Sequence, residues 1–255
     1  MKRSLIAFAA AVLLAAPSGP AAAGEVYQVS TIAALMAGGY DGVAGLRRVL
    51  SHGDFGLGTL AGVDGELVVL DGTAWQARSD GRVVRVGGTA RTPFAEVTRF
   101  HPDRHVAVPA GLSLAALEEL LDRQAPGPGR ILAARVDGVF AHLTVRSEPK
   151  QTPPYRPLAE VMKAEQRTFE HDGVAGTLVA FRFPPDGGGV GVPGWHIHFL
   201  SRDHRAGGHV LALETGRGSA GLEEIADLHV VFAARVPLAP AAMGEQLKAV
   251  EGGGK

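Results

Sequence analysis

The chain has 255 residues, of which 46% are hydrophobic, 20% are charged and 6% are aromatic. This balance excludes a collagen, a coiled coil and a disordered chain, and the length suffices for one large domain or two lobes of about 100 residues. The formal net charge is −1 and no run of five like charges occurs, which argues against a nucleic-acid or membrane-surface binder. Because cysteine is absent, any metal must be held by His, Asp or Glu.

Residues 1–23 have the pattern of a secretory signal peptide. Lys2 and Arg3 are followed by a short apolar stretch from Leu5 to Ala16, and three alanines that end at Ala23 offer small residues for cleavage. The apolar stretch is too short for a membrane span. We therefore expect an exported protein, periplasmic or extracellular, with no membrane contact in its mature form; an uncleaved N-terminal anchor is the alternative.

The rest of the chain has the pattern of an α+β protein that consists mostly of strands. Between Phe55 and Phe100, short β-rich runs alternate with turns that contain Gly and Asp. Apolar residues at helical spacing follow Ser113 and stop before the Pro-Gly pairs. In this first half we expect helices at 31–37 (capped by Ser30), at 45–50 and from Ser113 onward, and strands at 65–72 and 82–86.

The second half begins with a hairpin and a linker. The Asp137-Gly138 pair divides an apolar segment, Ile131 to Val145, and is expected to form the turn between two strands. Four prolines between Pro149 and Pro157 indicate a linker between two lobes. We therefore divide the chain into a signal peptide (1–23), an N-terminal α/β lobe (24–150) and a C-terminal β-rich lobe with a tail (151–255). The elements expected in the second lobe are a helix at 158–166 and strands at 177–183, 194–200, 208–214 and 227–236.

Three histidines on a predicted β-hairpin form the most informative pattern. His196 and His198 are two residues apart, so their side chains share one face of a strand, and Ile197 and Phe199 lie on the other. A turn-rich segment follows, and pairing of His198 with His209 would bring three imidazoles together. Such a set with open coordination positions is typical of catalytic Zn²⁺, and imidazole also suits other divalent transition metals. The alternative is three ordinary histidines on a polar face.

Two charged residues, Glu66 and Arg146, stand on expected strands, and their sequence neighbours indicate different environments. Glu66 alternates with Val68 and Leu70, so it faces inward on an apolar side of its strand. A glutamate in that position is either ion-paired or functional. Arg146 stands near the end of an expected strand, and its pattern alone is that of a surface charge.

Several short segments occur in an order that is characteristic of one family. They are residues 27–31 and 40–42, 52–59 with 64–67 and 70–72, 92–95 and 97–100, 135–140, then Arg146 with Pro149, Gln151, Pro154-Tyr155 and Pro157, and the histidine hairpin. Together they resemble the α-acetolactate decarboxylase family from about Tyr27 to Val236. The combination is far more specific than any single segment.

The resemblance implies two lobes with a metal in the second, and decarboxylation of 2-acetolactate to acetoin and CO₂. It implies that the three hairpin histidines are zinc ligands, the same set that the spacing selects. It further implies an essential arginine at Arg146 and acidic active-site residues at Glu66 and, near the C-terminus, Glu251. Two features depart from the family: Trp75 replaces a tyrosine, and the segment before Glu251 is short and alanine-rich.

Two other classes of protein were considered. An exported zinc hydratase or hydrolase could use the same three histidines, and a cupin-like metal-binding or sugar-binding module would need no catalysis at all. A metal carrier needs neither Glu66 nor Arg146, and a hydratase has no use for an arginine that holds a carboxylate. The decarboxylase, with the small molecule acetolactate as its substrate, is therefore favoured. The sequence leaves open whether the chain forms a homodimer, and which of Glu66 and Glu251 delivers the proton.

Overall fold

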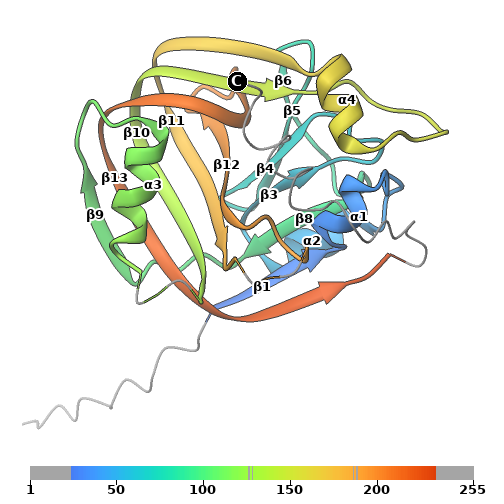
Figure 1. Cartoon of the computed structure of the whole chain (residues 1–255), viewed down its shortest axis with the longest axis horizontal. Coiled ribbons are helices and arrows are strands. Elements are labelled where there is room, and N and C mark those ends of the chain that lie inside the picture. The colour runs from blue at the N-terminus through green and yellow to red at the C-terminus, as the bar shows by residue number, and fades with distance from the viewer. Residues whose placement is uncertain (1–23, 126, 128, 186, 188, 234–255) are drawn as a thin grey trace, which may run out of the picture.

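The computed structural model describes residues 24–125, 127, 129–185, 187 and 189–233 (Figure 1). The expected signal peptide and Glu251 lie outside the described residues. The helices are α1 (Ile32–Met36), α2 (Leu46–His52), α3 (Leu114–Asp122) and α4 (Leu158–Glu165). The strands of the first half are β1 (Gly24–Val29), β2 (Ala44–Gly45), β3 (Phe55–Thr59), β4 (Glu66–Leu70), β5 (Thr73–Ala77), β6 (Val83–Arg85), β7 (Arg91–Thr92), β8 (Phe94–Thr98) and β9 (Arg104–Val108). The remaining strands are β10 (Ile131–Ser147), β11 (Arg167–Phe183), β12 (Gly194–Ser201) and β13 (Gly207–Val231).

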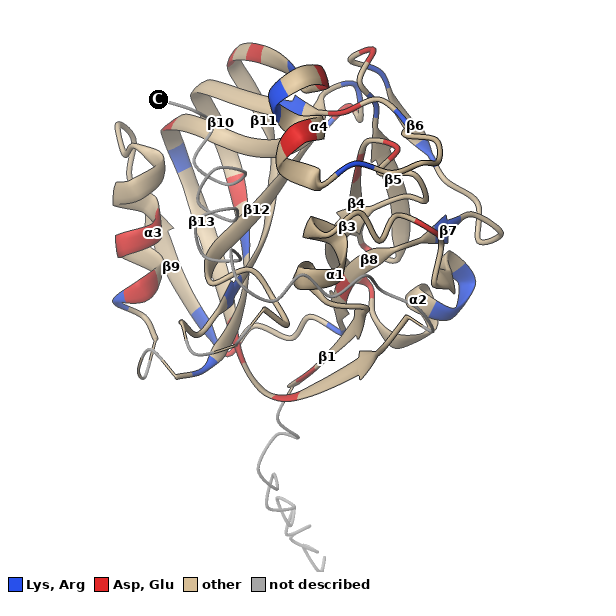
Figure 2. Ribbon diagram, turned by 45° about the vertical axis from the view of Figure 1, so that its right-hand side comes forward, with Lys and Arg blue, Asp and Glu red and all other residues tan. Residues whose placement is uncertain are grey.

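Most of the strands belong to one sheet of eleven strands, so the mostly-β architecture with a few short helices is confirmed. Strands β10, β11, β12 and β13 pair in that order, and β13 also pairs with β10, which closes a ring of strand pairings. Beyond this ring, β13 runs parallel to β1 and so connects to β8, β3, β4, β5 and β6 (Figure 2). The division of the chain into lobes at residue 150 stays a prediction.

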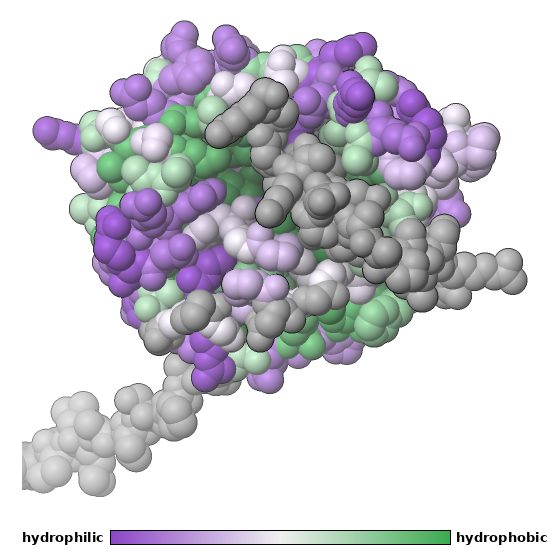
Figure 3. Space-filling view, in the orientation of Figure 1, coloured by the Kyte–Doolittle hydropathy of each residue, from purple (hydrophilic) through white to green (hydrophobic). Residues whose placement is uncertain are grey.

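Apolar side chains from both parts of the sheet meet in its interior. One cluster joins Phe55 of β3 and Val68 of β4 to Val179 and Phe181 of β11 and to Leu200 of β12. A second cluster packs α3 against side chains from all four strands of the ring. The face of the molecule in Figure 3 is mainly hydrophilic at its margins, with hydrophobic residues between them. The interior cluster lines the strand faces that also carry the histidines.

The start of α1 differs from the expectation in its capping residue. Thr31, not Ser30, is the N-cap, and its hydroxyl accepts a hydrogen bond from the backbone N–H of Ala34 at 3.1 Å. Ser30 has a φ of 60°, a left-handed conformation outside the extended region that an N-cap adopts. Helix α4 begins directly after Pro157, as the sequence predicts.

The predicted turn at Asp137-Gly138 is wrong, because β10 is one strand of 17 residues. Gly138 lies opposite Gly176 of β11 on one side and Gly218 of β13 on the other. A Cβ on Gly218 would lie 2.6 Å from the backbone oxygen of Asp137. The glycine pair therefore allows two backbones to approach closely rather than reversing the chain. The strands expected at 208–214 and from 227 likewise belong to the single strand β13.

Among the described residues, no helix is long and apolar enough to cross a membrane.

Candidate metal and substrate site

The three hairpin histidines converge in the interior, as the sequence predicts. His198 of β12 is the direct cross-strand partner of His209 of β13, and His196 lies on the same face of β12. Their possible ligand atoms all lie within 4.8 Å of one another, and their exposed fractions are 6%, 0% and 3% for His196, His198 and His209. On the opposite face of β12, Ile197 and Phe199 pack in the core. The alternation of polar and apolar residues on β12 thus builds the histidine triad.

The tautomer of His198 is fixed by a backbone contact. The Nδ1 atom lies 2.9 Å from the carbonyl oxygen of Leu67, and because a carbonyl only accepts, Nδ1 carries the hydrogen and donates it. The lone pair of this imidazole is therefore on Nε2, which is buried and has no hydrogen-bond partner among the residues that the structure describes. This arrangement is typical of a histidine that binds metal through one nitrogen and is oriented through the other.

Burial favours the neutral imidazole form of His198 and His209. Desolvation lowers the pKa of His198 well below its ordinary value, and the neighbouring His209 and Arg146 lower it further. Desolvation and the positive charge of Arg146 likewise lower the pKa of His209. A neutral imidazole is the form that binds a metal ion, whereas an imidazolium cannot.

Glu66, the first residue of β4, faces the triad from the other part of the sheet. Its carboxyl is buried, as expected, with a 6% exposed fraction for the residue, and Oε2 lies 3.4 Å from Nε2 of His198. The facing Nε2 atom has no hydrogen, so a proton on Glu66 or a cation is needed between these two acceptors. Because Leu67 is the next residue on β4, the same strand supplies both the orienting carbonyl and the facing carboxyl.

Arg146 is buried, so the surface charge that its own pattern suggests is wrong. Its exposed fraction is 2%, and it lies opposite His209 in the pairing of β10 with β13. Arg146 pairs with Thr168 of β11 on one side and with His209 of β13 on the other, so it lies within the ring and not at an exposed strand end. Together with Glu66, His196 and His209, it lines one cavity.

Glu148 is a buried acid that the sequence reasoning missed. It lines the same cavity, has an exposed fraction of 1% and follows Arg146 by two residues. Burial raises the pKa of Glu148 to about 7, although the charge of Arg146 and the interaction with Glu66 oppose this rise. The sequence signal that could have indicated Glu148 is its position two residues after Arg146.

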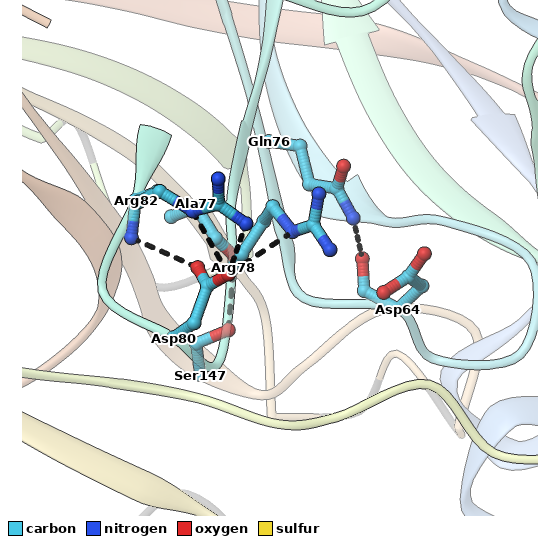
Figure 4. A network of polar contacts seen from close by, with 7 residues as sticks. All are labelled: Asp64, Gln76, Ala77, Arg78, Asp80, Arg82 and Ser147. Carbon is cyan, nitrogen blue, oxygen red and sulfur yellow. Dashed lines mark hydrogen bonds and ion pairs between the residues drawn. The ribbon is translucent and has the colours of Figure 1, made fainter. Parts of the chain in front are cut away.

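Two hydrogen bonds fix the chain segments that carry Glu66 and Arg146 (Figure 4). Ser147, directly after Arg146, donates through Oγ to the carbonyl oxygen of Ala77 at 2.9 Å. Gln76 donates through Nε2 to the carbonyl oxygen of Asp64 at 2.6 Å, at the loop that leads into β4. Strand β5 therefore holds both segments in place from one side.

The donor set fits a transition metal. Three buried imidazoles, one of them with its lone pair fixed by a backbone acceptor, match the ligand type of zinc and of related divalent ions. The carboxyl of Glu66 and the guanidinium of Arg146 border the same cavity, so a small molecule there would meet both a carboxyl group and a cation. The fold and the site together define a mostly-β protein with a buried three-histidine group that could hold a metal.

Comparison with known proteins identifies the family. The family model described as alpha-acetolactate decarboxylase matches residues 26–239. The α-acetolactate decarboxylase of Methanosarcina mazei is 43% identical over 212 residues, which covers 83% of this chain and 72% of that protein. The enzyme of Methylococcus capsulatus is 45% identical over 187 residues, or 73% of this chain and 72% of its own. The chain belongs to the α-acetolactate decarboxylase family.

The fold agrees with this assignment. The crystal structure of α-acetolactate decarboxylase from Bacillus subtilis strain 168 superposes with a TM-score of 0.86 and 31% sequence identity. The superposition covers 89% of this chain and 99% of that one. The activity is thus the decarboxylation of α-acetolactate, a carboxy-lyase reaction, and the hydratase and cupin alternatives are set aside.

Proposed function

We propose that this chain decarboxylates α-acetolactate with one divalent transition metal bound by His196, His198 and His209, and that the ion is Zn²⁺. The observation that carries the proposal is the convergence of three buried imidazoles, two of which line a cavity together with a buried acid and a buried arginine. The chemistry of the donor set supports zinc, and manganese, iron, cobalt and nickel are the other ions that imidazoles suit.

The cavity has a polar side and an apolar side, which suits a small keto acid with two methyl groups. Glu66, Arg146, Glu148, His196 and His209 form the polar side. Apolar side chains from α1, β8 and α4 form the other side, and they are Ile32, Leu35, Phe94, Leu158 and Met162. We infer that the carboxylate and oxygen functions of acetolactate face the polar side and that its methyl groups face the helices.

Decarboxylation breaks the bond between the carboxylate carbon and the carbon that carries the hydroxyl. The electron pair of that bond moves toward the neighbouring carbonyl and gives an enediolate, so negative charge develops on oxygen. A bound dication supplies Lewis-acid stabilisation of that charge. Arg146 holds the carboxylate, and then the enediolate, through parallel N–H donors in a planar fork.

A proton must then reach the carbon that lost CO₂, and this step fixes the configuration of acetoin. Glu66 is the proton donor that the geometry favours, because its carboxyl is buried beside the triad and Arg146. Glu251, outside the described residues, is the second candidate. A glutamate at each of two positions could serve opposite faces of the enediolate, so the two variants should differ in the enantiomeric excess of acetoin.

We also propose that the protein is exported, with residues 1–23 removed as a signal peptide. The basic start, the short apolar stretch and the alanines before Gly24 support this, as does the absence of cysteine. The mature protein then acts in the periplasm or outside the cell.

The deciding experiment incubates the purified mature chain with racemic acetolactate and assays acetoin and CO₂. A chelator should abolish turnover, and one equivalent of Zn²⁺ should restore it. Full turnover after complete removal of metal would overturn the metal part of the proposal. Absence of acetoin with every divalent ion tested would overturn the activity of this chain.

A further inference from the structure

A buried carboxyl group lies directly beside the first described residue of the chain. Glu223 of β13 has an exposed fraction of 5%, and its Oε1 would lie 2.4 Å from a Cβ built on Gly24. Both residues line a cavity of about 600 Å³ at the start of β1, where β1 begins its parallel pairing with β13. Figure 2 shows acidic residues on both strands at this point.

Glu223 lacks a cationic partner among the residues that the structure describes, unlike its neighbour. Glu224 pairs with Arg130 at 3.1 Å and with Arg104 at 3.4 Å. Glu223 accepts a hydrogen bond from the backbone N–H of His101 at 3.1 Å, and no Lys or Arg nitrogen of the described chain lies within 4 Å of its carboxylate. A buried carboxylate normally has a charged partner or becomes protonated.

The Glu223 carboxyl occupies the space where a side chain at position 24 would begin. With a Cβ on residue 24, the end of the Glu223 side chain would have to move, because Oε1 would lie only 2.4 Å away. The backbone nitrogen of a residue lies about 2.5 Å from its own Cβ position, across the tetrahedral Cα. The nitrogen of Gly24 is therefore within about 5 Å of the Glu223 oxygen.

We propose that Glu223 is the docking site for the α-ammonium group of Gly24 in the processed chain. This inference rests on the proposed removal of residues 1–23 and assigns the cleavage to the bond between Ala23 and Gly24. A signal peptidase hydrolyses that bond with one water: the hydroxyl joins the carbonyl carbon of Ala23, and the nitrogen of Gly24 becomes a protonated amine. Processing thus converts an uncharged amide into the cation that Glu223 lacks.

The charges around Glu223 agree with an added cation. Burial raises the pKa of the Glu223 carboxyl to about 7 before any ammonium is present; His101 opposes the rise, and the negative charges of Asp103 and Asp54 add to it. Glu25, Asp103 and Glu224 line the same cavity and favour a positive charge there, whereas Arg99 opposes it, and His52 and His101 also line the cavity. The new ion pair would tie β1 to β13, the parallel pair that joins the strand ring to the rest of the sheet.

The test measures the pKa of the α-amino group in chains that differ only at their start. The first chain begins at Gly24, the second carries Ala23 as one extra residue, and each is made with and without Glu223→Gln. Glu224→Gln is the matched control. The pKa is read from the pH dependence of the acylation rate of the α-amino group, and acetoin formation is assayed in parallel.

In the chain that begins at Gly24 we expect a tenfold or greater gain in proton affinity, which is a pKa at least one unit above the ordinary value of about 7.7–8.0. The extra Ala23 moves the amine by about 3.8 Å and should return the pKa to the ordinary range, which keeps the test valid if Glu223→Gln fails to fold. Glu223→Gln should also return the α-amino pKa to the ordinary range, whereas Glu224→Gln should leave it raised. An ordinary pKa in the Gly24 chain overturns the inference.

The mass of the exported protein, made from the full chain, separates this inference from the proposals on which it rests. A mature chain that begins at Gly24 supports both the export proposal and the docking site. A chain that begins elsewhere overturns the docking site, whatever its activity. Because Glu223 does not line the cavity of the histidine triad, acetoin formation with an unperturbed α-amino pKa contradicts only the present inference.

Discussion

Histidines in the interior and a histidine on the outer surface of the same sheet have pKa shifts of opposite direction. His198 and His209 face the interior, and burial lowers their pKa values. His142 of β10 is 43% exposed in its side chain and lies 2.9 Å from Asp172 of β11, whose carboxylate raises its pKa. In both cases the histidine lies opposite its neighbour in a pair of adjacent strands. Burial and the nature of the orienting partner, a carbonyl in one case and a carboxylate in the other, decide which histidines suit a metal.

The arginines of β10 show the same contrast. Arg135 is partly exposed and pairs with Asp137 at 2.8 Å and with Asp71 at 2.7 Å. Arg146, eleven positions further on the strand, is buried beside the triad. One strand therefore supplies a surface ion pair near one end and a buried cation at the cavity near the other. Each outer residue is a control for its inner counterpart.

The largest effect is expected for the histidines. His198→Ala should lose most of the bound metal and reduce acetoin formation to background, because a three-ligand site cannot spare one ligand. His142→Ala, its counterpart on the outer surface, should keep both. Metal analysis and an acetoin assay on the same samples measure this. Equal metal content in the two variants would contradict the contrast between the two groups.

Glu66→Gln should come next, with kcat lower by about 10²–10⁴-fold, the usual contribution of general acid catalysis. The amide keeps the shape of the side chain but cannot act as an acid. Bound metal should stay at its normal level, which distinguishes this variant from His198→Ala. If Glu66→Gln kept its kcat while Glu251→Gln lost the enantiomeric excess of acetoin, the proton donor would be Glu251 and not Glu66.

Arg146→Lys is expected to lower kcat/KM by about 10²-fold although it preserves the charge. A lysine ammonium is a point donor and cannot offer two parallel hydrogen bonds to a carboxylate. Arg135→Lys, on the same strand, should leave kcat/KM unchanged. Similar kinetics for the two variants would show that burial of Arg146 has no catalytic purpose.

The smallest of these effects is on stability and concerns Glu148. The pKa of this buried acid is about 7, whereas an unfolded glutamate titrates near about 4.3, so the folded state binds more protons between these values. The free energy of unfolding should therefore fall as the pH rises through this window, and no further above it. Glu148→Gln should flatten that slope. Chemical denaturation at a series of pH values measures it, and an unchanged slope would contradict the assignment.

The local parts of the fold and site could be predicted because they depend on short sequence periods. Alternation on one strand places His196 with His198, and the turn-rich segment between them and His209 predicts the observed pairing. Alternation likewise predicts the inward face of Glu66. These inferences require only a few neighbouring residues.

The remaining features depend on contacts between distant segments. Gly138 lies between Gly176 and Gly218, and only the assembled sheet shows that it allows close approach instead of a turn. The burial of Arg146 and Glu148 likewise comes from distant segments, because side chains of α1 and β8 line the same cavity. Ser30 shows a local limit: both Ser30 and Thr31 can cap a helix, and the left-handed backbone at Ser30 decides between them.

The most direct test of the central claim is a titration of the metal-free mature chain with Zn²⁺ while acetoin formation is followed. If the buried triad holds the functional ion, activity rises linearly and stops rising at one equivalent per chain. The variant that carries alanine at His196, His198 and His209 should then bind no Zn²⁺ and form no acetoin. Full activity before any Zn²⁺ is added, or one tightly bound equivalent in the triple variant, would contradict the claim.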